Sequence, residues 1–206
     1  MKKSLWSKVT GTVIGLLPLY LFTFSLLLSC SEEDNDEVEE YPEWQLKNDS
    51  YFSQLVQDTK TKGDRRLIVA YSKPDQDYTY VYSDYIVVEE LERGTETTSP
   101  LHTDSVEVHY VGHLLPSTTY ANGYEFDRSF SGEFDPVVAT PAKLYVGGTV
   151  VGFSTALQHM HRGDHWRVYI PYQLGYSTAT GSVPQYSTLI FDLRLVDYWG
   201  KAESEE

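Results

Sequence analysis

The segment around residue 108 constrains the fold more than any other, because its apolar and polar residues alternate strictly. Val106, Val108 and Tyr110 fall on one face of an extended chain, whereas Glu107 and His109 fall on the other. Tyrosine occurs 17 times among 206 residues, and it favours half-buried strands and binding rims. We therefore expect a β-rich domain built on a small antiparallel sheet.

The rest of the chain supports an α+β class. Apolar residues make up 41% of the chain, which fits one domain with a substantial core plus extensions. One short helix is expected over 154–161, and residues 130–140 are expected to form a flap or loop insertion. We place this domain at residues 79–200. The strands expected within or next to it cover residues 78–91, 105–114, 123–129, 144–146, 164–171 and 186–199.

An N-terminal helical extension is expected at residues 43–78, ahead of this domain. Its apolar side chains recur at helical spacing up to about residue 60: Trp44, Tyr51, Phe52, Leu55 and Val56. Such a stripe either packs on the following domain or mediates a homodimer through residues 43–62. Its aromatic and aliphatic content favours packing over a free linker.

The N-terminus resembles a bacterial lipoprotein export signal. Lysines precede a mostly apolar run that ends at Leu27-Leu28-Ser29-Cys30, a sequence similar to a lipobox. We expect residues 1–29 to be the signal peptide and Cys30 to carry the lipid, with an uncleaved transmembrane anchor as the alternative. Cys30 is the only cysteine, so the fold cannot contain an internal disulfide.

Acidic segments are expected at both ends of the mature chain, as a tether at residues 30–42 and a tail at 201–206. Acidic residues directly behind a lipidated cysteine resemble the surface-export signal of Bacteroidetes lipoproteins. The expected location is therefore the outer membrane, facing either the cell surface or the periplasm. The net charge of −14 and the lack of a clustered basic stripe argue against nucleic-acid binding.

Other reaction chemistries have little support in the sequence. His159, His161 and His165 are candidates for zinc, but the helix is expected to end near Met160, so the three rings would point apart. A Gly-x-Ser-x-Gly nucleophile motif is absent. We expect neither a metal nor another cofactor.

Five motifs occur in one order along about residues 79–198. They are Val-His-Tyr-x-Gly from residue 108, Phe-Asp-x-Ser from 126, Val-x-Gly-Phe from 150, Ile-Pro-x-x-Leu-x-Tyr from 170 and Thr-Leu-Ile-Phe-Asp from 188. This order resembles the FK506-binding-protein (FKBP) family of peptidyl-prolyl cis–trans isomerases. The resemblance implies a curved antiparallel sheet of about five strands wrapped around one short helix, with a pocket between them.

The resemblance also implies which side chains form that pocket. Tyr110, Phe126 and Phe191 correspond to its walls, and Phe153 corresponds to its floor, where the family often has tryptophan. Ala142 stands where the family commonly has a second pocket phenylalanine. An aromatic pocket of this kind would surround the ring of a substrate proline.

Polar groups of the pocket are implied by the same motifs. The backbone N–H of Val150 and the hydroxyl of Tyr176 correspond to groups that hydrogen-bond the substrate. Asp127 corresponds to the pocket carboxylate, and Arg128 is a candidate for its basic partner. Val183 is expected to line the loop between the last two strands.

The expected function is isomerisation of X–Pro bonds in exported or cell-envelope proteins, by removal of water and by hydrogen bonding in the pocket. The partners are proline-containing polypeptides, and macrolides of the FK506 class are expected ligands. The departure at Ala142 and a shorter loop at 177–184 leave an alternative open. On that alternative the domain is a catalytically weak FKBP-like binding or chaperone module of an envelope complex.

Overall fold

The computed structural model describes residues 39–74 and 77–200 of the chain. The expected signal peptide at 1–29, the lipidation site Cys30 and the acidic tail at 201–206 lie outside these residues, as does most of the expected tether. Over the described ranges, no helix combines the length and the apolar character needed to cross a membrane.

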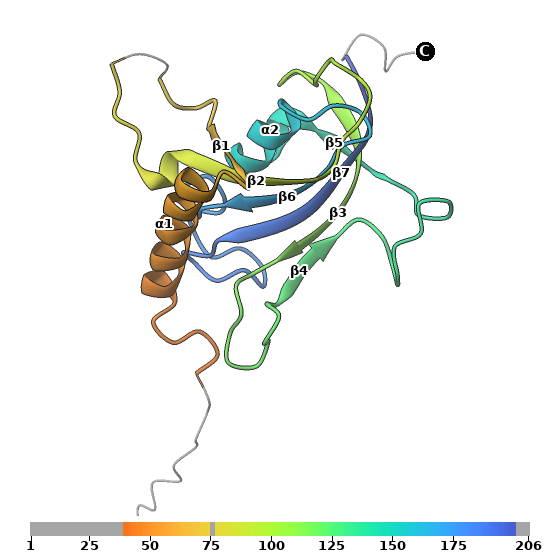
Figure 1. Cartoon of the computed structure of the whole chain (residues 1–206). Helices are drawn as coiled ribbons and strands as arrows, with labels where there is room; N and C mark the ends of the chain where they lie inside the picture. The colour runs from red at the N-terminus through yellow and green to blue at the C-terminus, as the bar shows by residue number, and fades with distance from the viewer. Residues whose placement is uncertain (1–38, 75–76, 201–206) are drawn as a thin grey trace, which may run out of the picture. The chain divides into compact units, whose positions relative to one another are not determined.

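A curved antiparallel sheet of seven strands forms the body of the domain (Figure 1). Its spatial order is β1-β2-β6-β7-β3-β4. β7 pairs along the whole of one edge of β3, so β5 and β4 share the other edge, β5 pairing its first half and β4 its second. The strands are β1 (Arg66–Val69), β2 (Tyr85–Glu92), β3 (Ser105–His113), β4 (Glu125–Arg128), β5 (Ala142–Tyr145), β6 (His165–Ile170) and β7 (Leu189–Trp199).

The α+β class is confirmed, but the expected number of about five strands is too low. Six segments were expected to be strands, and the one they lack is β1, which lies inside the segment expected to be a helical extension and pairs antiparallel with β2. It is four residues long, and so short an apolar run carries little alternation to distinguish it from a loop.

The helix beneath the sheet, α2, runs over Val151–Leu157 instead of the expected 154–161. The expected start was wrong because Gly152 is an unfavourable residue inside a helix and reads as part of a turn. The structure gives a reason for glycine there, since a Cβ at residue 152 would lie 2.3 Å from Cγ2 of Ile170. Gly152 therefore allows α2 to pack closely against β6.

The strand expected from residue 78 begins only at residue 85, because a short 3-10 helix, η1 (Tyr82–Asp84), precedes it. The carboxylate of Asp84 accepts a hydrogen bond from the Val81 N–H at 2.8 Å. The Lys73 ammonium lies 2.7 Å from the same carboxylate, which is buried. These bonds stabilise a turn where the alternation of tyrosines indicated a strand.

The main core lies between α2 and the concave face of the sheet (Figure 1). The inward face expected for β3 is confirmed for Val106 and Val108, which are fully buried. A bulge interrupts the pairing of β3 with β7, because Val196 is an extra residue in β7. The bulge leaves the alternation of β3 itself unchanged, so His109 and Tyr110 still point to opposite faces.

The helix α1 (Trp44–Lys62) packs on the opposite face of the sheet at β2 and β6. Its Phe52 and Val56 form a second apolar cluster with Val87 and Tyr169. Apart from Tyr51, which is exposed, the stripe on α1 is therefore buried within its own chain, which is the first of the two alternatives expected for it.

A 3-10 turn, η2 (Val146–Gly148), links β5 toward α2.

Two buried hydrogen bonds fix α1 to the loop before β7. The Trp44 indole N–H donates to Oγ of Ser187 at 2.9 Å. The backbone N–H of Thr188 donates to Oδ1 of Asn48 at 2.7 Å. Because Asn48 is buried, its amide holds the helix and the loop together through paired polar groups.

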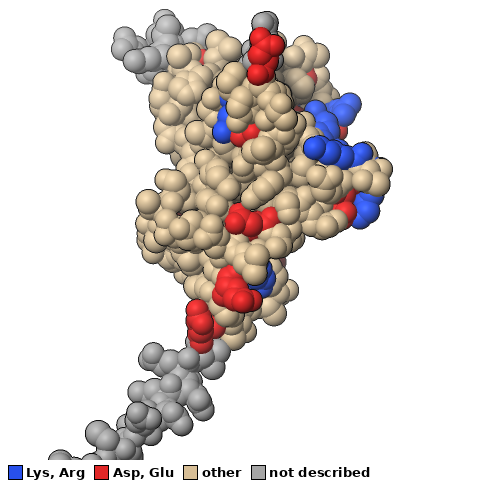
Figure 2. All heavy atoms as spheres, turned by 90° about the vertical axis from the view of Figure 1, so that its left-hand side faces the viewer, with Lys and Arg blue, Asp and Glu red and all other residues tan. Residues whose placement is uncertain are grey.

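The charged side chains on the α1 side of the molecule are mixed in sign (Figure 2). On the face shown, Lys and Arg lie in small groups beside Asp and Glu, among a majority of uncharged residues. This face shows no continuous basic stripe of the kind that nucleic-acid binding uses.

Candidate active site

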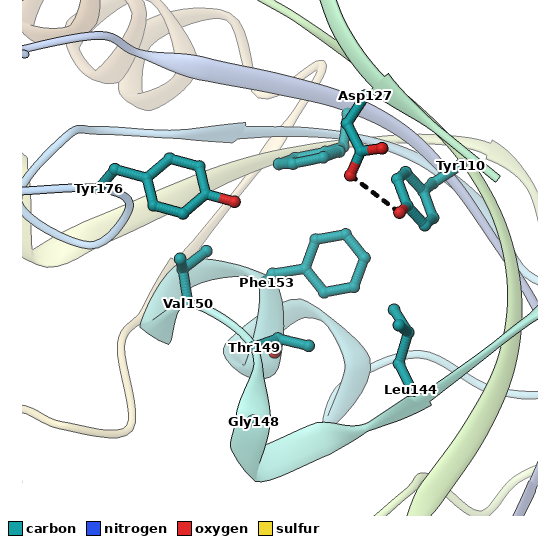
Figure 3. A pocket seen from close by; sticks show the side chains of 9 residues that line it. Tyr110, Asp127, Leu144, Gly148, Thr149, Val150, Phe153 and Tyr176 are labelled. Carbon is teal, nitrogen blue, oxygen red and sulfur yellow. Dashed lines mark hydrogen bonds between the residues drawn. The ribbon is translucent and has the colours of Figure 1, made fainter. Parts of the chain in front are cut away.

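A cavity of about 230 Å³ opens on the concave side of the sheet, over the start of α2 (Figure 3). Residues distant in the sequence meet there because β3, β4 and β7 are neighbours and the 144–153 segment crosses below them. The cavity is lined by Tyr110, Asp127, Leu144, Gly148, Thr149, Val150, Phe153, Tyr176 and Phe191.

Three aromatic rings form the apolar part of this cavity. The ring centroids of Phe153 and Phe191 lie 5.0 Å apart, and the Tyr110 ring lies 5.9 Å from Phe153 and 6.0 Å from Phe191. All three pairs meet edge to face, the arrangement that the quadrupoles of aromatic rings favour. The result is a rigid apolar floor and wall.

Phe126 supports this wall from behind. Its ring centroid lies 5.5 Å from that of Phe191, but Phe126 does not line the cavity itself. Gly112 makes the contact possible, because a Cβ there would lie 2.6 Å from Cζ of Phe126 and 2.7 Å from Cε1 of Phe191. The expected wall residue is therefore present as a second layer.

A tyrosine–carboxylate hydrogen bond marks the polar side of the cavity. The Tyr110 hydroxyl donates to Oδ2 of Asp127 at 2.9 Å (Figure 3). Burial, and then the Asp127 carboxylate, raise the pKa of Tyr110. A raised pKa keeps the phenol protonated at neutral pH, so it remains a hydrogen-bond donor.

Tyr176 and Val150 line the other side of the cavity, and the Tyr176 hydroxyl points into it (Figure 3). Burial raises the pKa of Tyr176, and the Asp127 charge adds to the shift. Val150 is the residue before the first turn of α2, and its backbone carbonyl accepts from the Ser154 N–H at 2.9 Å. Both residues expected to contact a substrate through polar groups thus lie at the cavity.

Arg128, the candidate for the basic partner of Asp127, does not pair with it. Arg128 instead forms a bidentate ion pair with Glu125 and donates to the carbonyl of Gly132 at 2.9 Å. Neighbouring residues of a strand point to opposite faces, so Arg128 on β4 is directed away from the carboxylate beside it. Tyr110 occupies the partner position.

Three lining residues were not among the expected site residues. Leu144 is the third residue of β5, whereas Gly148 and Thr149 belong to the turn before α2. The Thr149 hydroxyl donates to the carbonyl of Val146 at 2.9 Å, which closes this turn. Their place directly ahead of the Val-x-Gly-Phe motif was the signal available in the sequence.

Two expected substrate contacts lie elsewhere. Val183 is buried in the main core and forms an isolated antiparallel bridge with Thr180. Ala142 is half-buried on β5, where it pairs with Val108 of β3. Neither residue lines the cavity.

The three histidines considered for zinc are separated in the structure. His159 stacks on Tyr71 with ring centroids 4.9 Å apart, whereas Nδ1 of His165 lies 3.5 Å from Glu92. Over residues 39–74 and 77–200, the structure contains no group of three or more potential metal ligands from His, Cys, Asp and Glu.

Comparison with known proteins places this cavity in a family. Residues 96–196 match the model of the FKBP-type peptidyl-prolyl cis-trans isomerases. The chain is 36% identical over 105 residues to an FKBP-type 22 kDa peptidyl-prolyl cis-trans isomerase of Escherichia coli, covering 50% of this chain and 45% of that protein. It is 27% identical over 152 residues to the outer membrane protein MIP of Legionella longbeachae, covering 73% of this chain and 58% of that protein.

A solved structure has a similar fold. A peptidyl-prolyl cis-trans isomerase from Pseudomonas syringae superposes with a TM-score of 0.52 at 25% sequence identity, covering 76% of this chain and 94% of that one. The chain spans only about half of the length of the curated relatives described above. The matched segment contains all of the aromatic rings and the carboxylate of the cavity. Residues 96–196 therefore form a domain of the FKBP-type peptidyl-prolyl cis-trans isomerase family.

Proposed function

We propose that the protein is a peptidyl-prolyl cis–trans isomerase whose active site is the cavity described above. The observation that carries this proposal is the edge-to-face arrangement of Tyr110, Phe153 and Phe191 around a hollow of about 230 Å³. A hollow of that size with an apolar floor fits a pyrrolidine ring. The family membership of residues 96–196 supports the same conclusion.

The reaction requires rotation about a bond with partial double-bond character. The barrier is about 18–20 kcal/mol, and it arises from amide resonance that places negative charge on oxygen. Water stabilises this dipolar planar form, so an apolar cavity that excludes water favours the less dipolar, twisted transition state relative to it. No covalent bond to the protein forms, and each lowering of the barrier by about 1.4 kcal/mol increases the rate about tenfold.

The polar groups of the cavity would hold the substrate during this rotation. The proline ring would pack on Phe153, while the Tyr176 hydroxyl and the Val150 N–H would donate to substrate carbonyls. The Tyr110 hydroxyl fixes the Asp127 carboxylate at the rim, through the 2.9 Å hydrogen bond. Preorganised donors of this kind act without the reorganisation that water would need.

Conservative variants of polar groups provide the test. Tyr176→Phe and Asp127→Asn, made in the full chain, are expected to lower kcat/KM on an X–Pro peptide in a protease-free assay by about tenfold each, the effect of about 1.4 kcal/mol of transition-state stabilisation. Tyr145→Phe is the matched control, because Tyr145 is about half exposed and does not line the cavity. The proposal fails if both cavity variants isomerise the peptide as fast as the control.

The same assay separates the enzyme from a catalytically weak binding or chaperone module. Inhibition of a measurable rate by a macrolide of the FK506 class supports the enzyme. Peptide binding without any rate increase supports the module and contradicts the isomerase proposal.

We infer that the clients are exported or cell-envelope proteins, and that Cys30 anchors the chain by a lipid to the outer membrane. The lipobox-like sequence supports this location, and one relative is named an outer membrane protein. Metabolic labelling with a fatty acid, lost in Cys30→Ser, tests the anchor.

A homodimer through residues 43–62 stays a prediction. Leu46 and Tyr51 are the large apolar residues of α1 that are exposed and could contact a second copy.

A further inference from the structure

A second cluster of aromatic and histidine side chains lies on the face of the sheet opposite α2. It is covered by residues 129–141, which we call the β4–β5 loop. The ring centroids of Phe130 and Phe134 in this loop lie 6.4 Å and 5.0 Å from the ring of His109. His109 is 6% exposed, although it follows Val108 and precedes Tyr110 on the alternating strand β3. The loop therefore buries a polar ring that strand alternation directs away from the candidate active site.

Two cavities surround this cluster. The smaller has a volume of about 190 Å³ and is lined by His109, Tyr110, Val111, Phe130, Phe134, His165, Asp192 and Arg194. The larger, of about 740 Å³, shares His109, Phe134 and Arg194 with it. Only Tyr110 also lines the candidate active site.

The His109 ring lacks a hydrogen bond that a buried polar group normally makes. Its Nδ1 is buried and has no partner among the described residues. Buried polar groups are nearly always hydrogen-bonded, because an unpaired one loses its hydration without compensation. A bound group that donates to or accepts from this imidazole would recover the loss.

The charges around the smaller cavity are already paired. Arg194 donates to both carboxylate oxygens of Glu92 at 2.8 and 2.9 Å, and Arg167 donates to both oxygens of Asp192 at 2.9 and 3.1 Å. The ring of Phe134 also covers the Arg194 guanidinium, 5.3 Å away. A charged ligand would find no unpaired counter-charge there, so the cavity favours a neutral one.

The size and the walls of the cavity indicate the rest of the ligand. A cavity of about 150 Å³ with apolar walls is large enough to hold benzene, and this one measures about 190 Å³. Phe130, Phe134 and Val111 supply apolar and aromatic walls, against which a planar ring packs edge to face or offset.

We propose that the smaller cavity binds a neutral aromatic ring that carries a hydroxyl group. The ring would pack against Phe130 and Phe134, and the hydroxyl would hydrogen-bond the imidazole of His109. This chemistry has two possible sources, a free phenolic molecule or the tyrosine side chain of another polypeptide. The proposal does not depend on the isomerase activity, because His109, Phe130 and Phe134, the residues that would contact the ligand, do not line the candidate active site.

Phenol and toluene are the probes, since they share a ring and differ in the hydroxyl. Each is titrated into the full chain while the imidazole ¹H–¹³C signals of its six histidines are followed by NMR. We expect saturable shifts of the His109 and His165 signals, with toluene binding about tenfold more weakly, the effect of one hydrogen bond. Equal affinities for the two probes would overturn the proposal, as would phenol shifts that leave His109 unchanged.

Substitution of the imidazole gives an independent readout. His109→Leu is expected to weaken phenol about tenfold while leaving toluene binding unchanged. His113→Leu is the matched control, because His113 lies on the same strand and does not line the cavity. If His109→Leu does not fold, Phe134→Ala replaces it and should weaken both probes. Unchanged phenol binding in the folded variant would refute the site.

A final pair of titrations distinguishes the two sources. Tighter binding of a short peptide with a central tyrosine than of p-cresol assigns the site to a polypeptide, whereas tighter binding of p-cresol assigns it to a small molecule. Either result supports the site, and failure of both to shift His109 contradicts it. An X–Pro peptide without tyrosine should not displace phenol, which keeps this test separate from that of the isomerase.

Discussion

Adding one methyl group at Gly112 should disturb both the stability of the domain and the wall of the candidate active site. The new Cβ would lie 2.6 Å from Cζ of Phe126 and 2.7 Å from Cε1 of Phe191. Carbon atoms in ordinary contact lie about 3.5 Å apart or more, so each ring would have to move by about 0.8 Å. Phe191 is 5% exposed and packs on Phe153, so its ring has little free space to move into.

The expected size of the effect follows from two opposing terms. Overpacking a close-packed core costs about 1–3 kcal/mol. The replacement of glycine by alanine also restricts the unfolded chain, which stabilises by about 0.4–1 kcal/mol. We therefore expect Gly112→Ala to lower the unfolding free energy by about 1–2 kcal/mol, or the Tm by about 2–8 °C for a chain of this size.

Denaturant unfolding followed by circular dichroism measures this loss. Gly148→Ala is the control, because a Cβ there would meet Tyr145 at 3.4 Å, an ordinary contact; its effect should stay within about 0.5 kcal/mol. Phe126→Leu removes the atom that the methyl group strikes, so Gly112→Ala should cost at least about 0.5 kcal/mol less in that background. Equal costs in both backgrounds would refute the steric argument.

Three further variants test separate parts of the structure. Asn48→Ala should lower the unfolding free energy by about 1–3 kcal/mol by leaving buried groups unpaired, whereas Asn122→Ala, on an exposed loop, should change it little. Arg194 lowers the pKa of Glu92 from 4.5 to about 2. The stability that results is present above pH 4.5 and is lost as the pH falls toward 2. Glu92→Gln should therefore make the unfolding free energy less dependent on pH over that range. Burial, and then Arg194, lower the pKa of His109 from 6.5. The folded state therefore binds fewer protons than the unfolded state, so the unfolding free energy falls as the pH drops below 6.5. In His109→Leu, the unfolding free energy measured at about pH 5–7 should fall less.

The sequence predicted the site best where chemistry and strand alternation agreed. Tyr110 lies on the face of β3 that alternation directs inward, and Phe153, Tyr176 and Phe191 lie at the cavity as the motifs indicated. Alternation also argued against Arg128 as the partner of Asp127, because adjacent strand residues point apart. Arg128 was a candidate only because it follows Asp127 in the sequence, and in the structure Tyr110 bonds Asp127 instead.

Other features depend on strand register, which no local pattern supplies. The bond between Tyr110 and Asp127 requires Gly112 to pair with Asp127, next to a register shift at His113. The position of Phe126 behind Phe191 has the same origin. Pairing between strands is set by contacts distant in sequence, so neither feature could be read from residue spacing.

The two proposed sites are adjacent on β3, and Tyr110 connects them through its hydrogen bonds with Ser129. The Tyr110 N–H donates to Oγ of Ser129 at 2.9 Å, and the Ser129 N–H donates to the Tyr110 carbonyl at 3.0 Å. Ser129 begins the β4–β5 loop over His109, while Tyr110 bonds Asp127 on the other face. A ligand that orders this loop should therefore bias the rim of the active site.

Thermodynamic linkage makes this coupling testable in both directions. If phenol changes the affinity of the protein for an X–Pro peptide by some factor, the peptide must change the affinity for phenol by the same factor. We expect coupling of about fivefold or more, reduced in Ser129→Ala, which removes the side-chain acceptor but keeps the backbone bond. Phenol and peptide that bind the folded protein without affecting each other would show that Ser129 transmits nothing, and that the faces of β3 act independently.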